Sequence, residues 1–132
     1  RAVQVPRPQD NQRLFIYKIS KRLDDDISAV LGAFWLQFEG DTVSDCRLAF
    51  GGMAGIPKRA TGAEAALRGA RFDETAVAAA QAALAADFSP LSDVRASASY
   101  RTTVAGNLLL RALHEFRAGA AGTSALTVTD YA

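Results

Sequence analysis

The sequence is poor in the residues that build metal centres and covalent crosslinks. Its 132 residues include one cysteine, Cys46, and one histidine, His114. A single cysteine excludes an internal disulfide, and one cysteine with one histidine makes a structural zinc site improbable. The absence of disulfides suits a reducing compartment, so we expect the protein to act in the cytoplasm. We expect no metal site in this chain.

Further absences exclude other classes of function. The formal net charge of +1 gives no field that would favour nucleic acid or an anionic membrane as a partner. The chain has no apolar run of the roughly 20 residues that cross a bilayer, and no signal peptide begins at Arg1. It contains neither an internal repeat nor a heptad pattern. Because Arg1 is not an initiator methionine, we expect the chain to be part of a longer protein.

What the chain does contain fits one globular domain. Apolar residues make up 49% and charged residues 22% of the sequence, as in ordinary globular proteins, and 132 residues suffice for one core. The prolines and polar residues of segment 1–12 predict an extended lead-in and linker. Segment 118–132 is small and polar without a period, which predicts a loose tail. The folded domain is expected at residues 13–117.

The first half of the chain predicts strands. Residues 14–19 are rich in β-branched and aromatic side chains, and residues 27–38 are apolar on both faces, as in a central strand covered on each side. A short turn at Gly40 leads into an alternating segment at residues 42–50, which predicts an antiparallel hairpin. The alternation turns Cys46 inward, which favours a small buried hydrophobe over a reactive thiol.

The second half predicts three helices, at residues 59–69, 74–88 and about 96–116. Strands followed by helices predict an α+β fold, in which about three helices pack on a small antiparallel sheet of about three to four strands. His114 lies near the end of the third helix, where a surface position is a simpler interpretation than catalysis. The apolar stripe of that helix is expected to contain Tyr100, Val104, Leu108, Ala112 and Phe116.

Two adjacent glycines, Gly51 and Gly52, follow a predicted strand and raise the question of a phosphate-binding loop. The Walker pattern needs a lysine directly after a glycine, whereas Lys58 follows Pro57. The dinucleotide fingerprint also fails, because Pro57 stands where its helix should continue. We therefore expect the glycines to turn the chain from the sheet into the first helix, with Met53 filling a gap in the core.

The most unusual stretch is KISKRLDDDIS, at residues 18–28. It contains three cations followed by three consecutive carboxylates: Lys18, Lys21, Arg22, Asp24, Asp25 and Asp26. Adjacent aspartates repel one another and are poor in strand interiors, so the stretch must be a loop or the boundary of an element. On residue chemistry alone it is either a solvated turn or part of a site, and the turn is the simpler of the two.

Three segments together resemble one protein family. They are KISKRLDDDISAV (18–30), LAFGGMAGIPKRA (48–60) and SDVRASASYRTTVAGNLLLR (92–111). The same order and spacing occur in the C-terminal domain of the FAD-binding subunit of xanthine dehydrogenase, a domain shared with carbon monoxide dehydrogenase flavoproteins. The form is most similar to the small subunit of bacterial enzymes. The resemblance implies a molybdenum hydroxylase in which a large subunit oxidises a purine at molybdopterin, and iron–sulfur clusters, FAD and NAD then receive the electrons in turn.

The resemblance also implies which residues approach the flavin. In the family most FAD contacts come from the preceding domain, which follows an iron–sulfur domain in the same subunit, and the charged loop forms one wall near the isoalloxazine. Lys18 matches a lysine near the ring. Arg22 and Asp25 match charged positions that influence the electrostatics of the ring and NAD access, and Asp26 matches the adjoining aspartate. Leu23 departs from the arginine of the animal enzymes, which puts their loop switching in doubt here.

We therefore expect an oxidoreductase domain with no catalytic residue of its own, which neither turns over nor binds FAD in isolation. The alternative is a non-catalytic assembly or binding module that shares the fold, and the intact charged loop favours the flavin role. Arg95, Ser97, Tyr100 and Arg101, at the start of the third helix, either line a domain or subunit interface or form ion pairs with neighbours such as the aspartates.

Overall fold

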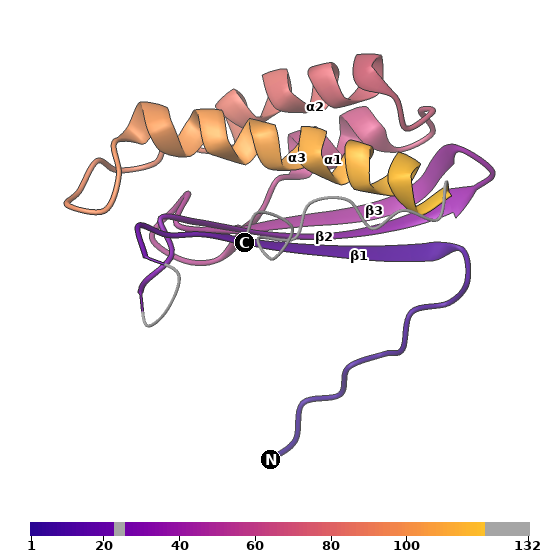
Figure 1. Cartoon of the computed structure of the whole chain (residues 1–132), viewed down its shortest axis with the longest axis horizontal. Helices are drawn as coiled ribbons and strands as arrows, with labels where there is room; N and C mark the ends of the chain where they lie inside the picture. The colour runs from indigo at the N-terminus through magenta and orange to yellow at the C-terminus, as the bar shows by residue number, and fades with distance from the viewer. Residues whose placement is uncertain (23–25, 121–132) are drawn as a thin grey trace.

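The computed structural model of the chain describes residues 1–22 and 26–120. One antiparallel sheet has the strand order β1-β2-β3-β4, and all the helices lie on one face of it (Figure 1). The strands are β1 (Gln12–Ile19), β2 (Val30–Glu39), β3 (Thr42–Gly51) and β4 (Lys58–Arg59), and the helices are α1 (Thr61–Leu67), α2 (Glu74–Asp87) and α3 (Ala98–Ala120). The predicted α+β class is confirmed.

The hairpin of β2 and β3 turns at Gly40, whose φ of 60° is a conformation that residues with a Cβ rarely adopt. The predicted start of this strand at Ile27 is wrong, since β2 begins at Val30. The Ala29 N–H donates to the carbonyl of Ile19 at 2.7 Å and so closes the preceding loop. α3 extends beyond its predicted end at Phe116 to Ala120, so residues 118–120, predicted as the start of the loose tail, are helical. The rest of the predicted tail, residues 121–132, lies outside the described residues.

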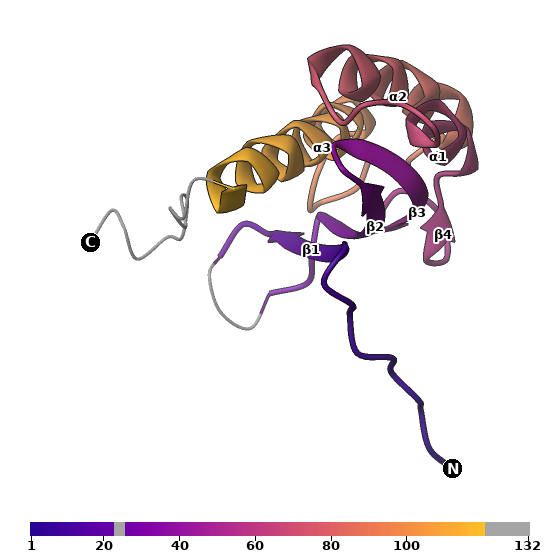
Figure 2. The same cartoon turned by 90° about the vertical axis from the view of Figure 1, so that its right-hand side faces the viewer.

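A second cover for β2 was also expected from its apolar residues, and it is not present among the described residues. The side chains of Phe34 and Leu36 are buried beneath the helices, whereas Ala33 and Trp35, which alternate with them, are only half-buried. Figure 2 shows all the helices on one side of the sheet and the lead-in leaving on the other side. One face of the sheet is therefore open.

The two-residue strand β4 was not predicted. Arg59 was assigned to the first helix, but it pairs with Ala49 of β3, and the Ala60 N–H donates to the carbonyl of Leu48 at 2.8 Å. Helix α1 begins only at Thr61. A strand of this length is too short to show an alternating pattern, so the sequence contains no signal for it.

The core between sheet and helices is largely aromatic. Six phenylalanine rings form close pairs across it: Phe34 with Phe50, Phe50 with Phe88, Phe38 with Phe72 and Phe116, and Phe72 with Phe116. Each buried ring of this size stabilises the fold by roughly 1.5–3 kcal/mol. Small residues on α2, such as Ala76 and Ala80, are buried against the other elements, and Asp73 caps this helix by accepting from the Ala76 N–H at 3.0 Å.

The single cysteine and the single histidine stand where the sequence predicted, one inside and one on the surface. Cys46 is fully buried, its thiol donates to the backbone carbonyl of Glu64, and burial raises its pKa to about 11. His114 is exposed near the end of α3. Among residues 1–22 and 26–120 no cluster of His, Cys, Asp or Glu could hold a metal ion, and no helix there is both long and apolar enough to span a membrane.

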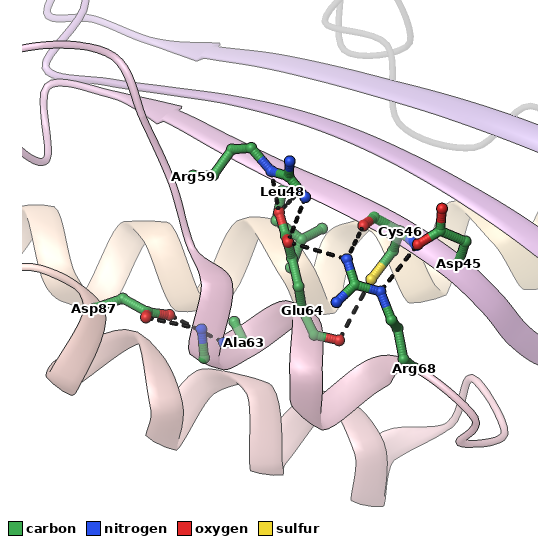
Figure 3. Close-up of polar contacts among 9 residues, drawn as sticks. Asp45, Cys46, Leu48, Arg59, Ala63, Glu64, Arg68 and Asp87 are labelled. Carbon is green, nitrogen blue, oxygen red and sulfur yellow. Dashed lines mark hydrogen bonds and ion pairs between the residues drawn. The ribbon is translucent and has the colours of Figure 1, made fainter.

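The carboxylate of Glu64 is the centre of a polar cluster that joins β3, β4 and α1, which we call the frame (Figure 3). The residue is 1% exposed, and one carboxylate oxygen accepts from the Leu48 N–H and from Arg59 Nε, each at 2.9 Å. The other accepts from Arg59 at 2.7 Å and from Arg68 at 3.2 Å. Burial acts to raise the pKa of Glu64, but these hydrogen bonds and the two guanidinium charges outweigh it and hold the pKa below its usual range.

A second carboxylate, that of Asp87 at the end of α2, supplies the N-terminal cap that α1 lacks. Ala60 stands at the cap position and has no side chain that could accept a hydrogen bond. Asp87 instead accepts from the N–H groups of Gly62 at 2.9 Å and Ala63 at 3.0 Å (Figure 3). Two unpaired donors of a short helix are thereby satisfied from a neighbouring helix, which holds α1 and α2 together.

The substitution Glu64→Gln should destabilise the protein by roughly 2–3 kcal/mol at pH 7, because a buried carboxylate with four donors becomes a group that accepts fewer of them. Urea unfolding monitored by circular dichroism measures this loss. Since the pKa of Glu64 is lowered in the folded state, its contribution is present above the unfolded pKa of about 4.3 and is lost as the pH falls through the folded pKa. The stability curves of the two proteins should therefore converge below about pH 4.

The matched control is Asp45→Asn. Asp45 accepts from Arg68 at 2.9 Å, but both side chains are close to half exposed, so the cost should stay below about 1 kcal/mol. Equal losses in the two variants, or a gap for Glu64→Gln that does not change with pH, would contradict the structural role assigned to Glu64.

Candidate functional site

Three connecting segments meet at one end of the sheet, and we call this region the loop corner. They are the β1–β2 loop (residues 20–29, of which 23–25 are not described), the segment after β3 (residues 52–57) and the α2–α3 connection (residues 88–97). Figure 1 shows them together at the left-hand end of the sheet. Each belongs to one of the three sequence segments that carried the resemblance. The pattern found along the sequence is therefore one place in space.

The side chain of Arg101, in the first turn of α3, joins the three segments. It is 4% exposed. One guanidinium nitrogen donates both to the carbonyl of Ala29 and, at 2.8 Å, to the carbonyl of Gly52. The other terminal nitrogen donates to the Asp93 carboxylate at 2.7 Å. A planar group with several fixed donors is suited to such a junction, because one side chain can satisfy acceptors that come from different directions.

Gly52 permits the close contact on which this junction depends. Its φ is 78°, and a Cβ at this position would lie 2.2 Å from the carbonyl oxygen of Ala29. Only glycine allows both the backbone conformation and the approach of the β1–β2 loop. The glycines lie at a turn, as predicted, but the turn leads first into β4 and only then into the first helix. Met53 is fully buried, as predicted.

Asp93 organises the third segment and balances the buried guanidinium. It accepts from the N–H groups of Arg95 at 2.9 Å and Ala96 at 3.1 Å as well as from Arg101. The two backbone hydrogen bonds and the guanidinium lower the pKa of Asp93 to about 2. Of the two roles considered for Arg101, an ion pair is therefore observed, and its partner is Asp93.

The residues proposed from the sequence as a flavin wall are partly brought together. The Arg22 N–H donates to a carboxylate oxygen of Asp26 at 3.2 Å, and the two side chains approach to 4.0 Å. Asp25 lies outside the described residues. Lys21 donates to the carbonyl of Val94 at 2.7 Å and so ties the loop to the α2–α3 connection.

Lys18 differs from the other residues of the loop because it lies within β1. It is exposed, stands opposite Leu31 of β2 and has no ion pair with any described residue. Tyr17, its neighbour in sequence, is buried under the helices, so the alternation of the strand turns Lys18 to the open face of the sheet. The positive charge of Lys18 is thus available to a group placed against that face.

Two pockets lie at the loop corner. One, of about 390 Å³, lies between Ile27, Gly52, Asp93 and Arg101. The other, of about 360 Å³, lies between Lys21, Arg95, Ser97 and Tyr100. Both are lined by the charged loop on one side and by the start of α3 on the other.

Sequence reasoning missed the importance of Arg101 and Asp93. The apolar stripe of α3 was predicted from Tyr100, which is 48% exposed, and Val104, which is only partly buried. The buried face contains Arg101, Ala105, Leu108 and Ala112. An arginine at spacing i, i+4, i+7 and i+11 with three apolar residues was the available signal, because a cation on a buried face needs acceptors nearby.

Two features of the loop corner that could bind a phosphate are already used within the domain. The close backbone approach at Gly52 is occupied by the carbonyl of Ala29, and the N–H groups of Arg95 and Ala96 are already taken by Asp93. To a large planar cofactor, the described residues of the corner offer an exposed cation, a loop end held by an ion pair, and a wall. A flavin could contact these residues, but the backbone at Gly52, Arg95 and Ala96 would not hold its phosphates.

Comparison with known proteins agrees with the geometry. Residues 15–116 match the family described as the CO dehydrogenase flavoprotein C-terminal domain. The chain is 35% identical over 98 residues to the carbon monoxide dehydrogenase medium chain of Hydrogenophaga pseudoflava, a match that covers 74% of this chain and 34% of that one. It is 34% identical over 110 residues to a xanthine dehydrogenase of Emericella nidulans, with 81% of this chain and 8% of that protein covered.

The fold agrees as well. A solved structure of carbon monoxide dehydrogenase from Hydrogenophaga pseudoflava, lacking the Mo-pyranopterin moiety of its cofactor, superimposes with a TM-score of 0.74 and 34% sequence identity. The match covers 81% of this chain and 37% of that one, so the chain spans only about a third of the medium-chain relative. Sequence, fold and the meeting of the three segments at Arg101 lead to one conclusion: the chain belongs to the family of CO dehydrogenase flavoprotein C-terminal domains.

Proposed function

We propose that this chain is the C-terminal domain of the FAD-containing electron-transfer subunit of a xanthine dehydrogenase-like molybdenum hydroxylase. In this proposal the charged loop, residues 18–28, forms one wall of the site shared by the isoalloxazine ring and NAD. The observation that carries it is the junction at Arg101, which holds the end of this loop against two other segments of the domain. Holding the described end of the loop in this way can present the charge of Asp26 at a defined position.

The chemistry of the site divides between the cofactor and the protein. FAD, when bound, supplies the redox step by taking electrons from iron–sulfur clusters and passing a hydride to NAD. Lys18 stabilises negative charge near the open face, because its ammonium group is exposed and unpaired among the described residues. Asp26 acts in the opposite direction, and its pairing with Arg22 limits that effect. The balance of these charges sets how readily the ring is reduced.

The remaining parts of the enzyme are assigned to other polypeptide. The pyrophosphate of FAD is bound by a domain that precedes this one, after an iron–sulfur domain, and substrate is oxidised at molybdopterin in a partner large subunit. The chain is about equally identical to a carbon monoxide dehydrogenase chain and to a xanthine dehydrogenase. This supports the division, because a domain that does not contact the substrate need not differ between enzymes with different substrates. We assign a purine as substrate and NAD as acceptor on the sequence resemblance.

The first test is Lys18→Ala in the assembled enzyme. Loss of a nearby cation should lower the flavin midpoint potential by roughly 20 mV, which corresponds to about 1 kcal/mol for a two-electron couple at a solvent-exposed site. Spectroscopic redox titration measures the potential, and steady-state kinetics compares NAD with an artificial acceptor. Turnover with the artificial acceptor should stay nearly unchanged.

The control for this test is Arg71→Ala, which removes an exposed cation paired with Asp41 at the opposite end of the domain. It should change neither the potential nor the NAD kinetics. A Lys18 variant that also leaves both unchanged would favour the alternative function, that of an assembly module without a flavin role.

The second test concerns Arg101 as a positioning residue. Arg101→Gln removes hydrogen bonds to Ala29, Gly52 and Asp93 and should destabilise the domain by about 2–4 kcal/mol. Hydrogen–deuterium exchange should accelerate at residues 26–30 and 52–56. Amides around Glu64 that exchange by local opening, and not by global unfolding, should exchange as in the wild type.

The matched control is Arg117→Gln. Arg117 lies at the other end of α3, where it forms an exposed ion pair with Glu74 of α2. It should leave exchange at the loop corner unaltered. Uniform acceleration over the whole domain in the Arg101 variant would show that Arg101 has a general structural role and does not hold the loop specifically.

The third test uses the 132-residue chain by itself. It should purify without flavin absorbance and should show no measurable FAD affinity in a fluorescence titration, because the pyrophosphate site is assigned to the preceding domain and Asp93 already occupies the N–H groups of Arg95 and Ala96 in the loop corner. Stoichiometric, tight binding of FAD by this chain alone would overturn the proposed division of the cofactor site.

A further inference from the structure

The open face of the sheet is apolar where a solvent-exposed face would be polar. Leu14 and Ile16 of β1 are 51% and 62% exposed. They stand directly opposite Trp35 and Ala33 of β2, which are half-buried. Leu31, two residues from Ala33 along β2, completes this set, which we call the open-face patch. All the helices of the described residues lie on the other side of the sheet (Figure 2).

This patch is unusual for a surface that stays in contact with water. An antiparallel sheet with one solvated face alternates apolar and polar residues along each strand, whereas β2 has apolar side chains at nearly every position. Single exposed apolar residues are common, but contiguous ones mark a surface that another element covers. The sequence pattern that predicted a cover on both faces of β2 therefore describes a second partner for the sheet.

The lead-in indicates where that partner is connected. Val5, Pro6 and Pro8 line a groove of about 410 Å³ together with Leu14 and Trp35 of the open-face patch. Figure 1 shows the lead-in leaving β1 on the side of the sheet opposite the helices. Polypeptide attached to this segment is held close to the patch, which gives it a high effective concentration there compared with a separate molecule.

We propose that the open-face patch is the docking surface for the FAD-binding domain that precedes residue 1 in the same chain. The inference rests on the proposed function. The chain spans about a third of the medium-chain relative, at 34% of its length, so a member of this family has the polypeptide to form such a domain. The docked domain would meet apolar side chains at its centre.

The position of Lys18 links this surface to the flavin site. Lys18 lies on the same face, two residues along β1 from Ile16 and at the end of the strand that leads into the charged loop. A domain that covers the patch would therefore reach Lys18 and the loop at the edge of its contact. At the other side of the patch the guanidinium of Arg47 lies over the ring of Trp35, at 5.6 Å, and supplies a polar rim.

Cysteine accessibility tests the proposal in the intact subunit that contains this chain. Ile16→Cys places a thiol in the patch, where the side chain is 62% exposed, and Ala79→Cys places one at an exposed position of α2, on the opposite side of the sheet (Figure 2). Both positions are exposed in this domain, so both substitutions should be tolerated. Cys46, the native cysteine, is fully buried.

Maleimide modification of each thiol is followed by peptide mass spectrometry and normalised to the rate in denaturant. The thiol from Ile16→Cys should react at least tenfold more slowly than that from Ala79→Cys, at every protein concentration. Equal rates would overturn the proposal. Protection that grows with protein concentration, or that appears only when the large subunit is added, would also overturn it, because the cover would then be a second copy or another subunit.

The flavin content of the same preparations separates this inference from the proposed function. A subunit that binds FAD but leaves the Ile16→Cys thiol reactive would refute the docking surface alone. Concentration-independent protection in a subunit without flavin would refute the proposed function and leave a docking surface for the preceding domain.

Discussion

The buried guanidinium of Arg101 is the interaction on which the functional end of this domain depends. Three segments that are far apart in sequence each contribute one carbonyl or carboxylate acceptor, and one planar side chain donates to all of them. The arrangement is exacting, because a buried cation that loses an acceptor is costly, and because Gly52 leaves no room for a Cβ between itself and Ala29. Loop order here is therefore coupled to the start of α3.

The domain contains a second buried charge, which has a different task. Glu64 joins β3 and β4 to α1 on the far side of the sheet from the open face, and its neighbours are satisfied within the frame. Both buried charges obey the same rule, that a charge removed from water needs several short hydrogen bonds. Glu64 holds α1 against β3 and β4, whereas Arg101 holds the three segments of the loop corner together. The packing of the helix and the arrangement of the loop corner are thus stabilised by different buried charges.

The loop corner and the open-face patch together suggest how such a domain participates in a larger enzyme. Neither is a complete site. The corner has charge and a loop end held by Arg101, but Asp93 occupies the N–H groups of Arg95 and Ala96, and the patch has apolar area but no cover among the described residues. Lys18 adjoins both, since it stands on the open face and leads into the loop. A partner domain that covers the patch would complete the corner in the same event, which would couple assembly to the electrostatics of the cofactor.

The sequence by itself determined the class of the fold, the hairpin at Gly40, the inward Cys46 and the family, because alternation, turn residues and ordered motifs are local signals. It could not determine that β4 exists, that α3 buries Arg101 in place of Tyr100, or that β2 has only one cover here. Two of those features arise from pairings that a linear pattern does not contain: that of Ala49 with Arg59, ten positions apart, and that of Arg101 with Ala29, 72 positions apart. The charged loop was visible in the sequence as a motif, but only the tertiary structure decided what holds it. The buried guanidinium of Arg101 needs acceptors in fixed directions, so Ala29, Gly52 and Asp93 must meet around it.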